Sequence, residues 1–355
     1  MNQPDRRSCA ISRRDLLLLA GAASALAAAP LVRAQSAAKL TIVYPTRSGA
    51  SWPLWIAQKA GLYEKHGLDV KLEFGVHPAG IAMVISNQAQ MTNYGMEQIL
   101  SASVRDPAFV MTGSSLNKGN FAMIAQKGMK KPADLKGKRV GIGRLGDPLY
   151  NFTLDLLRVW GMNERDVQWV PTGTDSKARA KMFLAGQLDA SLMVAPTYFE
   201  LEKMGYEVVD LLINHPDIYV STAYLFTKAW AKDHGDEIRR IIMAQTEAIA
   251  RFYADKAFAV QTYLAFDKRE QADVEQLYDL YKSRDVLDRV PLVQKAAVAS
   301  AIARTQQDVP ALKTFDPAQI IDMSIVRQLI ADGYFRKVFG DGIAAEEQRK
   351  LAASF

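Results

Sequence analysis

Cysteine is nearly absent from this chain, since Cys9 is the only one among 355 residues. It lies among arginines ahead of an apolar run, in a segment that we expect to be removed, and this setting does not look like a lipid-attachment site. The rest of the chain has no thiol, so it can form no disulfide and has no cysteine nucleophile. Disulfide frameworks and cysteine-based chemistry are therefore excluded.

Paired histidines and catalytic serine motifs are also missing. The four histidines are far apart and lack the spacing of a metal site: His66, His77, His215 and His234. No G-x-S-x-G occurs, and the S-x-x-K match at 115–118 lacks the partner motifs of the enzymes that carry it. The sequence therefore predicts no catalytic centre, no metal and no cofactor.

A long apolar run occurs only near the N-terminus, and residues 1–34 have the pattern of a cleaved export signal. Arginines precede the run at 16–26, and Leu31-Val32-Arg33-Ala34 suits a cleavage position. The stretch Ser12-Arg13-Arg14-Asp15-Leu16-Leu17 resembles the twin-arginine signal, which exports folded proteins. A spanning helix needs roughly 20 apolar residues, more than this run supplies. We expect cleavage near Ala34 and a periplasmic protein.

Strong charge of one sign is missing as well. Residues 1–34 contain five Arg and two Asp, so their removal lowers the net charge from +6 to +3. No basic cluster interleaved with aromatics remains, and nucleic-acid binding is not predicted. With 49% apolar and 23% charged residues, a chain of this length can bury a large core and is expected to divide into two lobes.

What is present is a repeated order of strands and helices. A strand at 39–44 leads to a helix that starts near Ser51 and Pro53 and ends near Gly61, and an alternating strand follows at 68–74. This β-α-β unit predicts a parallel sheet. Further strands are predicted at 91–94, 139–142, 167–170 and 190–194, and a helix with apolar residues at helical spacing at 237–254. Strand-like runs at 121–125 and 219–227 are candidate crossings between lobes.

The stretch "KGKRVGIGRLGDPLYNF" contains a complete G-x-G-x-x-G at Gly141, Gly143 and Gly146. A dinucleotide site needs the helix to begin within these glycines and an acid to end the following strand. Here Asp147-Pro148 reads as helix cap and first helical residue, and the following strand at 167–170 ends in Pro171-Thr172-Gly173 without the acid, its nearest acid, Asp166, lying before it. The turn is instead a helix N-terminus that could attract an anion, with Arg144 either adding charge or lying solvated at the surface.

Aromatic residues stand near several predicted strand ends: Trp52, Tyr94, Tyr150, Tyr198 and Tyr219. Two interpretations are open for each of them. They could form the apolar walls of a ligand cleft, or they could pack in the core as most aromatic side chains do.

Taken in order, four stretches resemble a known family: "GASWPLWIAQKAGLYEKHGLDVKLEF", "DLKGKRVGIGRLGDP", "LAGQLDASLMVAP" and the run after Tyr219. The resemblance covers nearly all of the chain after residue 34. It is to the periplasmic substrate-binding proteins of ABC importers, within the branch that binds nitrate, taurine, alkane and aromatic sulfonates, and the thiamine pyrimidine precursor.

The resemblance implies an α/β, two-lobed periplasmic binding protein of type II. It places lobe I at 35–124 plus 224–355 and lobe II at 125–223, joined by two crossovers, with the ligand in the cleft between them. The implied ligand contacts are Arg47, Ser51, Trp52, Gly95, Met96, Glu97, Ser114, Ser115, Arg144, Gly146, Asp147, Tyr150, Thr172, Thr174, Pro196 and Tyr198. Arg144 or Arg47 would hold the anionic end.

The function that the resemblance implies is capture of a small organic anion, such as a sulfonate or an aromatic carboxylate, without catalysis. A monomer would deliver the ligand to an ABC transporter permease. One alternative is an enzyme related to the pyrimidine-precursor synthase of this fold, whose cysteine-rich motif has no counterpart after residue 34. Another is a sensor that signals ligand binding to a receptor.

Overall fold

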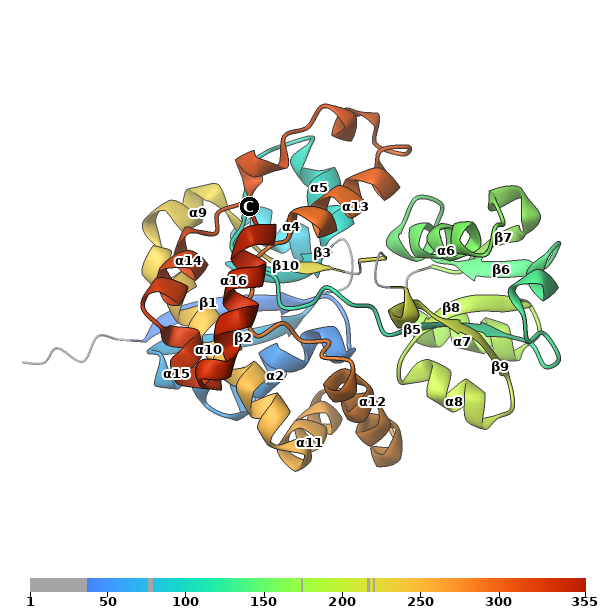
Figure 1. Ribbon diagram of the computed structural model, residues 1–355, viewed down its shortest axis with the longest axis horizontal. Coiled ribbons are helices and arrows are strands. Elements are labelled where there is room, and N and C mark those ends of the chain that lie inside the picture. The colour runs from blue at the N-terminus through green and yellow to red at the C-terminus, as the bar shows by residue number, and fades with distance from the viewer. Residues whose placement is uncertain (1–36, 76–78, 174, 216–217, 220) are drawn as a thin grey trace, which may run out of the picture. The chain divides into compact units, whose positions relative to one another are not determined.

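The computed structural model describes residues 37–75, 79–173, 175–215, 218–219 and 221–355. The predicted export signal at 1–34 and the predicted contact Thr174 lie outside the described residues. Residues 37–355 form one compact unit (Figure 1).

A first sheet contains the earliest strands of the unit. Its strands are β1 (Ala38–Tyr44), β2 (Leu68–Phe74), β3 (Met91–Gly95), β4 (Phe109–Met111) and β10 (Thr222–Thr227), in the order β2-β1-β3-β10-β4. Strand β1 pairs in parallel with β2 and β3, which confirms the predicted β-α-β unit. Strand β10 runs antiparallel to both of its neighbours.

A second sheet is built on the same plan. Its strands are β5 (Phe121–Ala125), β6 (Arg139–Ile142), β7 (Gln168–Pro171), β8 (Ala190–Val194) and β9 (Glu207–Leu211), in the order β7-β6-β8-β5-β9. Strand β6 pairs in parallel with β7 and β8, whereas β5 is antiparallel to β8 and β9.

Both sheets are mixed, so the prediction of a parallel sheet holds only for the β-α-β units. The antiparallel strands are the ones that carry the chain between the sheets. Strand β5 brings it into the second sheet and β10 returns it to the first. A strand that enters from the other sheet does not follow a local helical crossover, which is the connection that enforces parallel pairing.

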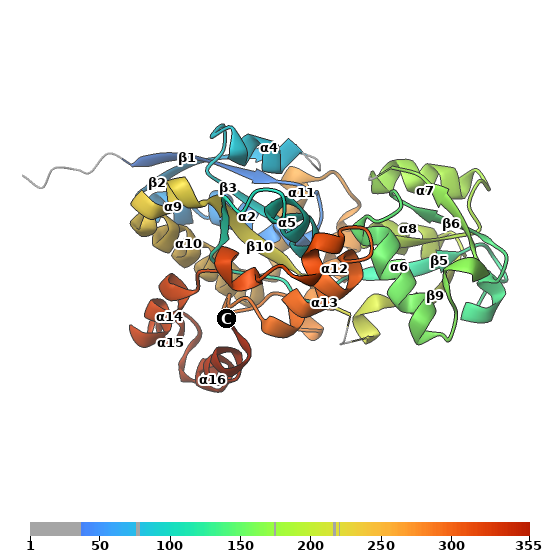
Figure 2. The same ribbon diagram turned by 90° about the horizontal axis from the view of Figure 1, so that it is seen from above.

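Helices cover both sheets (Figures 1 and 2). Three helices connect strands of the second sheet: α6 (Pro148–Val159), α7 (Ser176–Leu184) and α8 (Thr197–Lys203). The others are α2 (Trp52–Lys59), α3 (Leu62–Lys65), α4 (Ala79–Ile85), α5 (Met96–Ser103), α9 (Lys228–Asp233), α10 (Gly235–Ala254), α11 (Lys256–Phe266), α12 (Gln271–Ser283), α13 (Lys295–Thr305), α14 (Ser324–Ala331), α15 (Tyr334–Phe339) and α16 (Ala344–Ala353).

Helix α10 shows how the sequence pattern places these elements. The residues at helical spacing are all buried in the first-sheet core: Ile238, Ile241, Ile242, Gln245, Ile249 and Phe252. Its acids Asp236 and Glu237 occupy the first turn, where the helix dipole favours negative charge. The predicted helix at 237–254 is therefore confirmed.

Two segments cross between the sheets, one at 112–120 and one whose described residues are 212–215, 218–219 and 221. They contact each other through a bridge between Leu116 and Thr222 and through the Ser221 hydroxyl, which donates to Asn117 Oδ1 at 2.7 Å. The crossings therefore lie side by side at one place between the two sheets.

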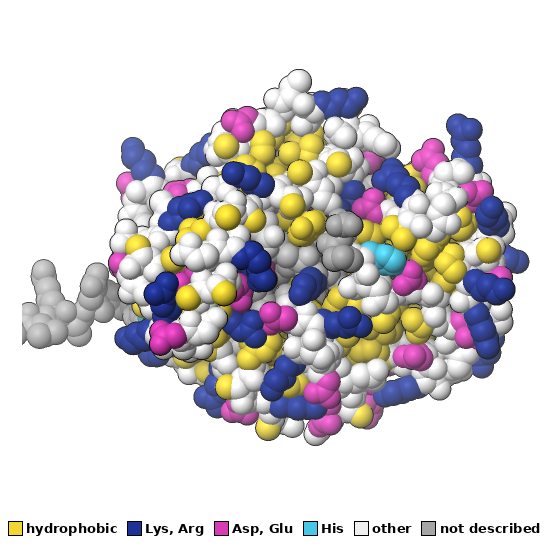
Figure 3. All heavy atoms as spheres, in the orientation of Figure 1, with side chains coloured by type: hydrophobic (Ala, Val, Ile, Leu, Met, Phe, Trp, Pro, Cys, Tyr) yellow, Lys and Arg dark blue, Asp and Glu magenta, His cyan; other side chains and the backbone are white. Residues whose placement is uncertain are grey.

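The surface carries mixed charge. On the face in Figure 3, Lys and Arg side chains are spread over the molecule with Asp and Glu among them. In the described part of the chain, none of the helices is both long and apolar enough to span a membrane.

Candidate functional site

A cavity of about 550 Å³ lies where elements of the two sheets meet. This volume is in the range of roughly 300–1,000 Å³ that small-molecule pockets occupy. The first-sheet elements contribute residues from the loop after β1, from β3 and from the start of α5, and the second-sheet elements contribute the starts of α6 and α7. Three aromatic rings give the wall apolar area: Phe74, Phe121 and Phe152.

Arg179 of α7 is the most unusual lining residue. Its side chain is buried, with the whole residue 3% exposed. Its one hydrogen bond is from Nη1 to the carbonyl of Gly173 at 3.4 Å, Nε has no partner, and no ion pair forms with the described carboxylates. Burial lowers the pKa of Arg179 to about 10, with Asp147 and Asp175 opposing the shift through space. A buried guanidinium that has unused N–H donors is a suitable hydrogen-bond partner for an anion.

Arg47 lines the cavity from the loop after β1. Its side chain is exposed, and its guanidinium carbon lies 4.1 Å from the centre of the Phe74 ring. That cation–π contact orients the guanidinium without neutralising its charge. Arg47 belongs to an element of the first sheet and Arg179 to a helix of the second. Each places at the cavity a positive charge that no described carboxylate pairs with.

The other two lining cations, Lys177 and Arg269, are already paired, and so is the lining acid Glu97. Lys177 and Arg269 bind the buried Asp267 at 3.1 and 2.8 Å, and Arg269 also binds Glu200 at 2.7 Å. Glu97 receives two hydrogen bonds from Arg304, from Nε at 3.1 Å and from Nη2 at 2.6 Å. These pairs leave Arg47 and Arg179 as the lining cations that a ligand can neutralise.

Asp147 occupies the helix N-terminus that the sequence suggested as an anion site. Its Oδ1 accepts from the Tyr150 amide at 2.9 Å and its Oδ2 accepts from the Arg144 amide at 2.8 Å, which confirms Asp147 as the cap of α6. Burial raises the pKa of Asp147, and these two hydrogen bonds oppose the rise. The carboxylate holds the position that a bound anion would need, so the positive charge of Arg179 replaces the α6 N-terminus as the expected anchor.

Each glycine of the G-x-G-x-x-G stretch has a packing reason of its own. A Cβ on Gly141 would lie 2.6 Å from Leu188, and a Cβ on Gly143 would lie 1.8 Å from Asp147 Oδ2. Gly146 has a φ of +78°, which favours glycine. The glycines therefore make room for the strand contacts and for the helix cap.

Gly143→Ala is expected to displace the Asp147 cap and to destabilise the fold by about 0.5–2 kcal/mol, the usual contribution of a helix cap. Chemical denaturation of the variant measures this change. Gly235→Ala is the matched control, because a Cβ there meets nothing within 4 Å. Equal stability of Gly143→Ala and the parent would show that the cap contributes nothing.

The structure brings five of the predicted site residues to the cavity: Arg47, Ser51, Gly95, Glu97 and Asp147. The remaining described ones lie outside its lining: Trp52, Met96, Ser114, Ser115, Arg144, Gly146, Tyr150, Thr172, Pro196 and Tyr198.

Local contacts explain three of these placements. Trp52 is fully buried in the first-sheet core, where its indole N–H donates to the Ala259 carbonyl at 2.8 Å. The Tyr150 ring packs edge-on against Trp169, with ring centres 4.8 Å apart. The Arg144 side chain is exposed at the surface, and only its backbone amide serves the site, through Asp147.

Sequence reasoning missed Arg179 and the polar groups that surround the cavity. Several lining residues bury a polar atom that has no hydrogen-bond partner among the described residues: Asn93 Oδ1, Gln98 Oε1, Asn120 Nδ2, Arg179 Nε and Thr222 Oγ1. Buried polar groups are normally hydrogen-bonded, so these five residues are the lining side chains that carry an unused donor or acceptor. One signal was available, because helical side chains lean toward the N-terminus and Arg179 is in the first turn of α7.

Within the described residues, His, Cys, Asp and Glu side chains form no group suited to hold a metal ion. The lining residues that the structure describes also include neither histidine nor cysteine. The described lining offers a ligand charged groups, hydrogen-bonding groups and apolar surface.

Comparisons with known proteins agree with this architecture. The profile of a family described as NMT1/THI5 like matches residues 49–282. A putative binding protein of Brucella abortus is 26% identical over 250 residues, covering 65% of this chain and 74% of that protein. A 4-amino-5-hydroxymethyl-2-methylpyrimidine phosphate synthase of Saccharomyces cerevisiae is 24% identical over 240 residues, covering 62% and 69%.

Among solved structures, the periplasmic aliphatic sulphonate binding protein SsuA of Escherichia coli superimposes with a TM-score of 0.63. Its sequence identity is 19%, and the match covers 82% of this chain and 91% of that one. A likeness at this identity shows the fold, which is the two-lobed α/β fold of periplasmic binding proteins. The predicted fold class is confirmed.

Proposed function

This chain belongs to the NMT1/THI5-like family, and from that premise we propose that it is a substrate-binding protein for a small organic anion. The observation that carries the proposal is the pair Arg179 and Arg47, two lining guanidiniums that form no ion pair with the described carboxylates and that come from the elements of different sheets. An anionic group such as a sulfonate or carboxylate would satisfy both, and the phenylalanine rings would contact the rest of the ligand.

Binding and closure are linked in this proposal. The domain limits are those proposed from the sequence, with lobes at 35–124 plus 224–355 and at 125–223. An anion that contacts Arg47 and Arg179 together binds only when the two walls are close, so its binding energy favours the closed arrangement. The paired crossings near Leu116 and Thr222 would act as the hinge.

The proposal extends to export and delivery. Residues 1–34 would direct the chain to the periplasm and be removed near Ala34, and an ABC-type permease would receive the ligand from the closed form. The family also includes proteins named as synthases. We propose binding without catalysis, because the cysteine-rich motif of the pyrimidine-precursor synthase has no counterpart after residue 34.

A thermal-shift screen tests the function. The panel holds sulfonates, aromatic carboxylates, nitrate, pyrimidines and nicotinamide dinucleotides. A ligand at 100 times its Kd stabilises the folded state by about 2.7 kcal/mol, so a true ligand raises the melting temperature by several degrees. We expect a rise with one class of organic anion. A rise with dinucleotides or uncharged pyrimidines only would contradict the proposal.

A further inference from the structure

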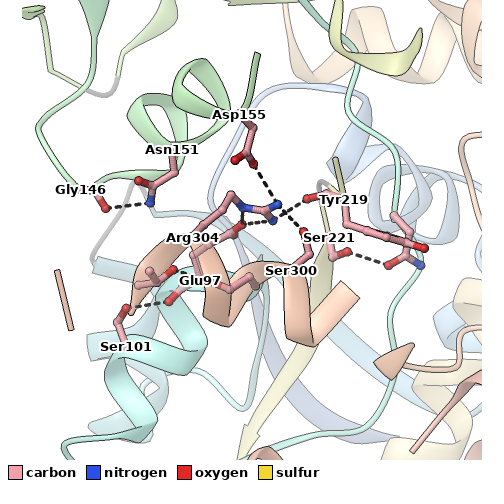
Figure 4. A network of polar contacts seen from close by, with 12 residues as sticks. Glu97, Ser101, Gly146, Asn151, Asp155, Tyr219, Ser221, Ser300 and Arg304 are labelled. Carbon is pink, nitrogen blue, oxygen red and sulfur yellow. Dashed lines mark hydrogen bonds and ion pairs between the residues drawn. The ribbon is translucent and has the colours of Figure 1, made fainter. Parts of the chain in front are cut away.

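Arg304 of α13 is a buried arginine that does not line the cavity but touches a residue that does. Its side chain is 4% exposed. Its Nε and Nη2 both donate to Glu97 Oε1, at 3.1 and 2.6 Å, and Glu97 lines the cavity from α5 (Figure 4). Arg304 therefore fixes the position of the cavity carboxylate.

The same guanidinium reaches two further parts of the molecule. Nη2 donates to the carbonyl of Tyr219, in the crossing that returns to the first sheet, at 2.7 Å. Nη1 donates to Asp155 Oδ2 at 3.4 Å, and Asp155 belongs to α6 of the second sheet (Figure 4). Arg304 thus joins the cavity wall, a crossing and the opposite lobe.

Neighbouring contacts strengthen the link between the segment that contains Arg304 and α6. The Arg304 guanidinium carbon lies 5.1 Å from the centre of the Phe152 ring, and Phe152 is a lining residue of α6. Asp308 follows α13, and its carboxylate lies against Gly146, so closely that a Cβ on Gly146 would be 2.8 Å from Asp308 Oδ2. The C-terminal end of α13 and the residues that follow it therefore pack against α6 and the turn that precedes it.

We propose that Arg304 is a positioning residue whose contact with Asp155 latches the two lobes in the closed arrangement. The Glu97 pair is short and buried on both sides, so it stays intact when the lobes separate and keeps the Arg304 charge compensated. The Asp155 contact is longer and lies at a more exposed carboxylate, with its side chain 16% exposed. It is the contact that opening breaks.

Asp155 has a second partner, which provides the control. Arg158 of the same helix binds Asp155 Oδ1 at 3.0 Å without leaving the second lobe. Burial raises the pKa of Asp155, and Arg304 is the largest opposing influence, ahead of Arg158. Asp155→Ala removes the latch, whereas Arg158→Ala truncates a partner of the same carboxylate and leaves the latch in place.

Distances between nitroxide labels, measured by pulsed electron resonance, test the proposal. The full chain with Cys9→Ser carries labels at Lys71→Cys of β2, in the first sheet, and Lys181→Cys of α7, in the second lobe. Both positions are exposed, and both elements contribute lining residues to the cavity. Asp155→Ala is expected to raise the ratio of long-distance to short-distance populations roughly threefold or more. Arg158→Ala is expected to leave this ratio unchanged.

An unchanged distance distribution in Asp155→Ala would overturn the latch, as would an equal shift in Arg158→Ala. Circular dichroism and melting curves establish that both variants are folded before labelling. The inference rests on the proposed function only where the latch would affect ligand affinity. Closure itself is measured on the protein without ligand. A failed ligand screen and a failed latch are therefore separate results.

Discussion

Replacement of Arg179 by methionine is expected to lower the affinity for the organic anion by roughly 30-fold to several thousandfold. Truncating one partner of a buried, hydrogen-bonded charge pair costs about 2–5 kcal/mol, and about 1.4 kcal/mol is a tenfold change in Kd. Titration calorimetry with the anion that raises the melting temperature measures the effect.

The stability of Arg179→Met is expected to equal or exceed that of the parent. Arg179 is a buried cation whose Nε has no hydrogen-bond partner among the described residues, and burial disfavours its charged form. An unbranched apolar side chain of similar length removes that unfavourable burial. A variant that loses stability and affinity together would indicate a structural role for Arg179.

Arg144→Ala is the matched control, because Arg144 is an exposed arginine beside the same helix cap. We expect no change in affinity for this variant. The sequence alone favoured Arg144 or Arg47 as the anion ligand, and the structure leaves Arg47 at the cavity and adds Arg179. A loss of affinity in Arg144→Ala, with none in Arg179→Met, would show that the anion binds at the glycine turn and not at Arg179.

Trp52→Ala is expected to destabilise the protein by about 3–5 kcal/mol, the usual effect of removing a fully buried tryptophan. Trp52 has no exposed surface, and its ring lies 5.0 Å from that of Phe252 and 4.9 Å from that of Tyr263. The change opens a cavity and leaves the Ala259 carbonyl without its indole donor. Denaturant titration measures the free energy of unfolding.

Trp169→Ala controls for the loss of a tryptophan that is only partly buried, and its effect is expected to be smaller. The pair also separates the two interpretations of the aromatic residues. If Trp52 were a cleft wall, its loss would reduce affinity and leave stability nearly intact, which would contradict its placement in the core.

Local signals predicted most of the scaffold. The strand at 139–142 and the cap-and-proline pair Asp147-Pro148 follow from residues adjacent in sequence, and both are confirmed. Helix α10 follows from apolar spacing within one element. Such features depend on chain neighbours, which a single sequence displays directly.

Features that depend on tertiary contacts could not be predicted in this way. Ser51 stands at the N-cap of α2, but its hydroxyl donates to the Thr46 carbonyl instead of capping, because a short 3-10 turn precedes the helix. The links from Arg304 to Glu97 and Asp155 join helices far apart in sequence. Burial makes Arg179 a candidate ligand, and burial is set by the packing of the whole lobe.

The most direct test of the account is a crystal structure of the protein with the anion that emerges from the thermal-shift screen. We expect the anionic group in the cavity, within hydrogen-bond distance of the Arg179 guanidinium and in contact with the Arg47 guanidinium. A ligand bound elsewhere, or one in the cavity whose anionic group contacts neither arginine, would contradict it.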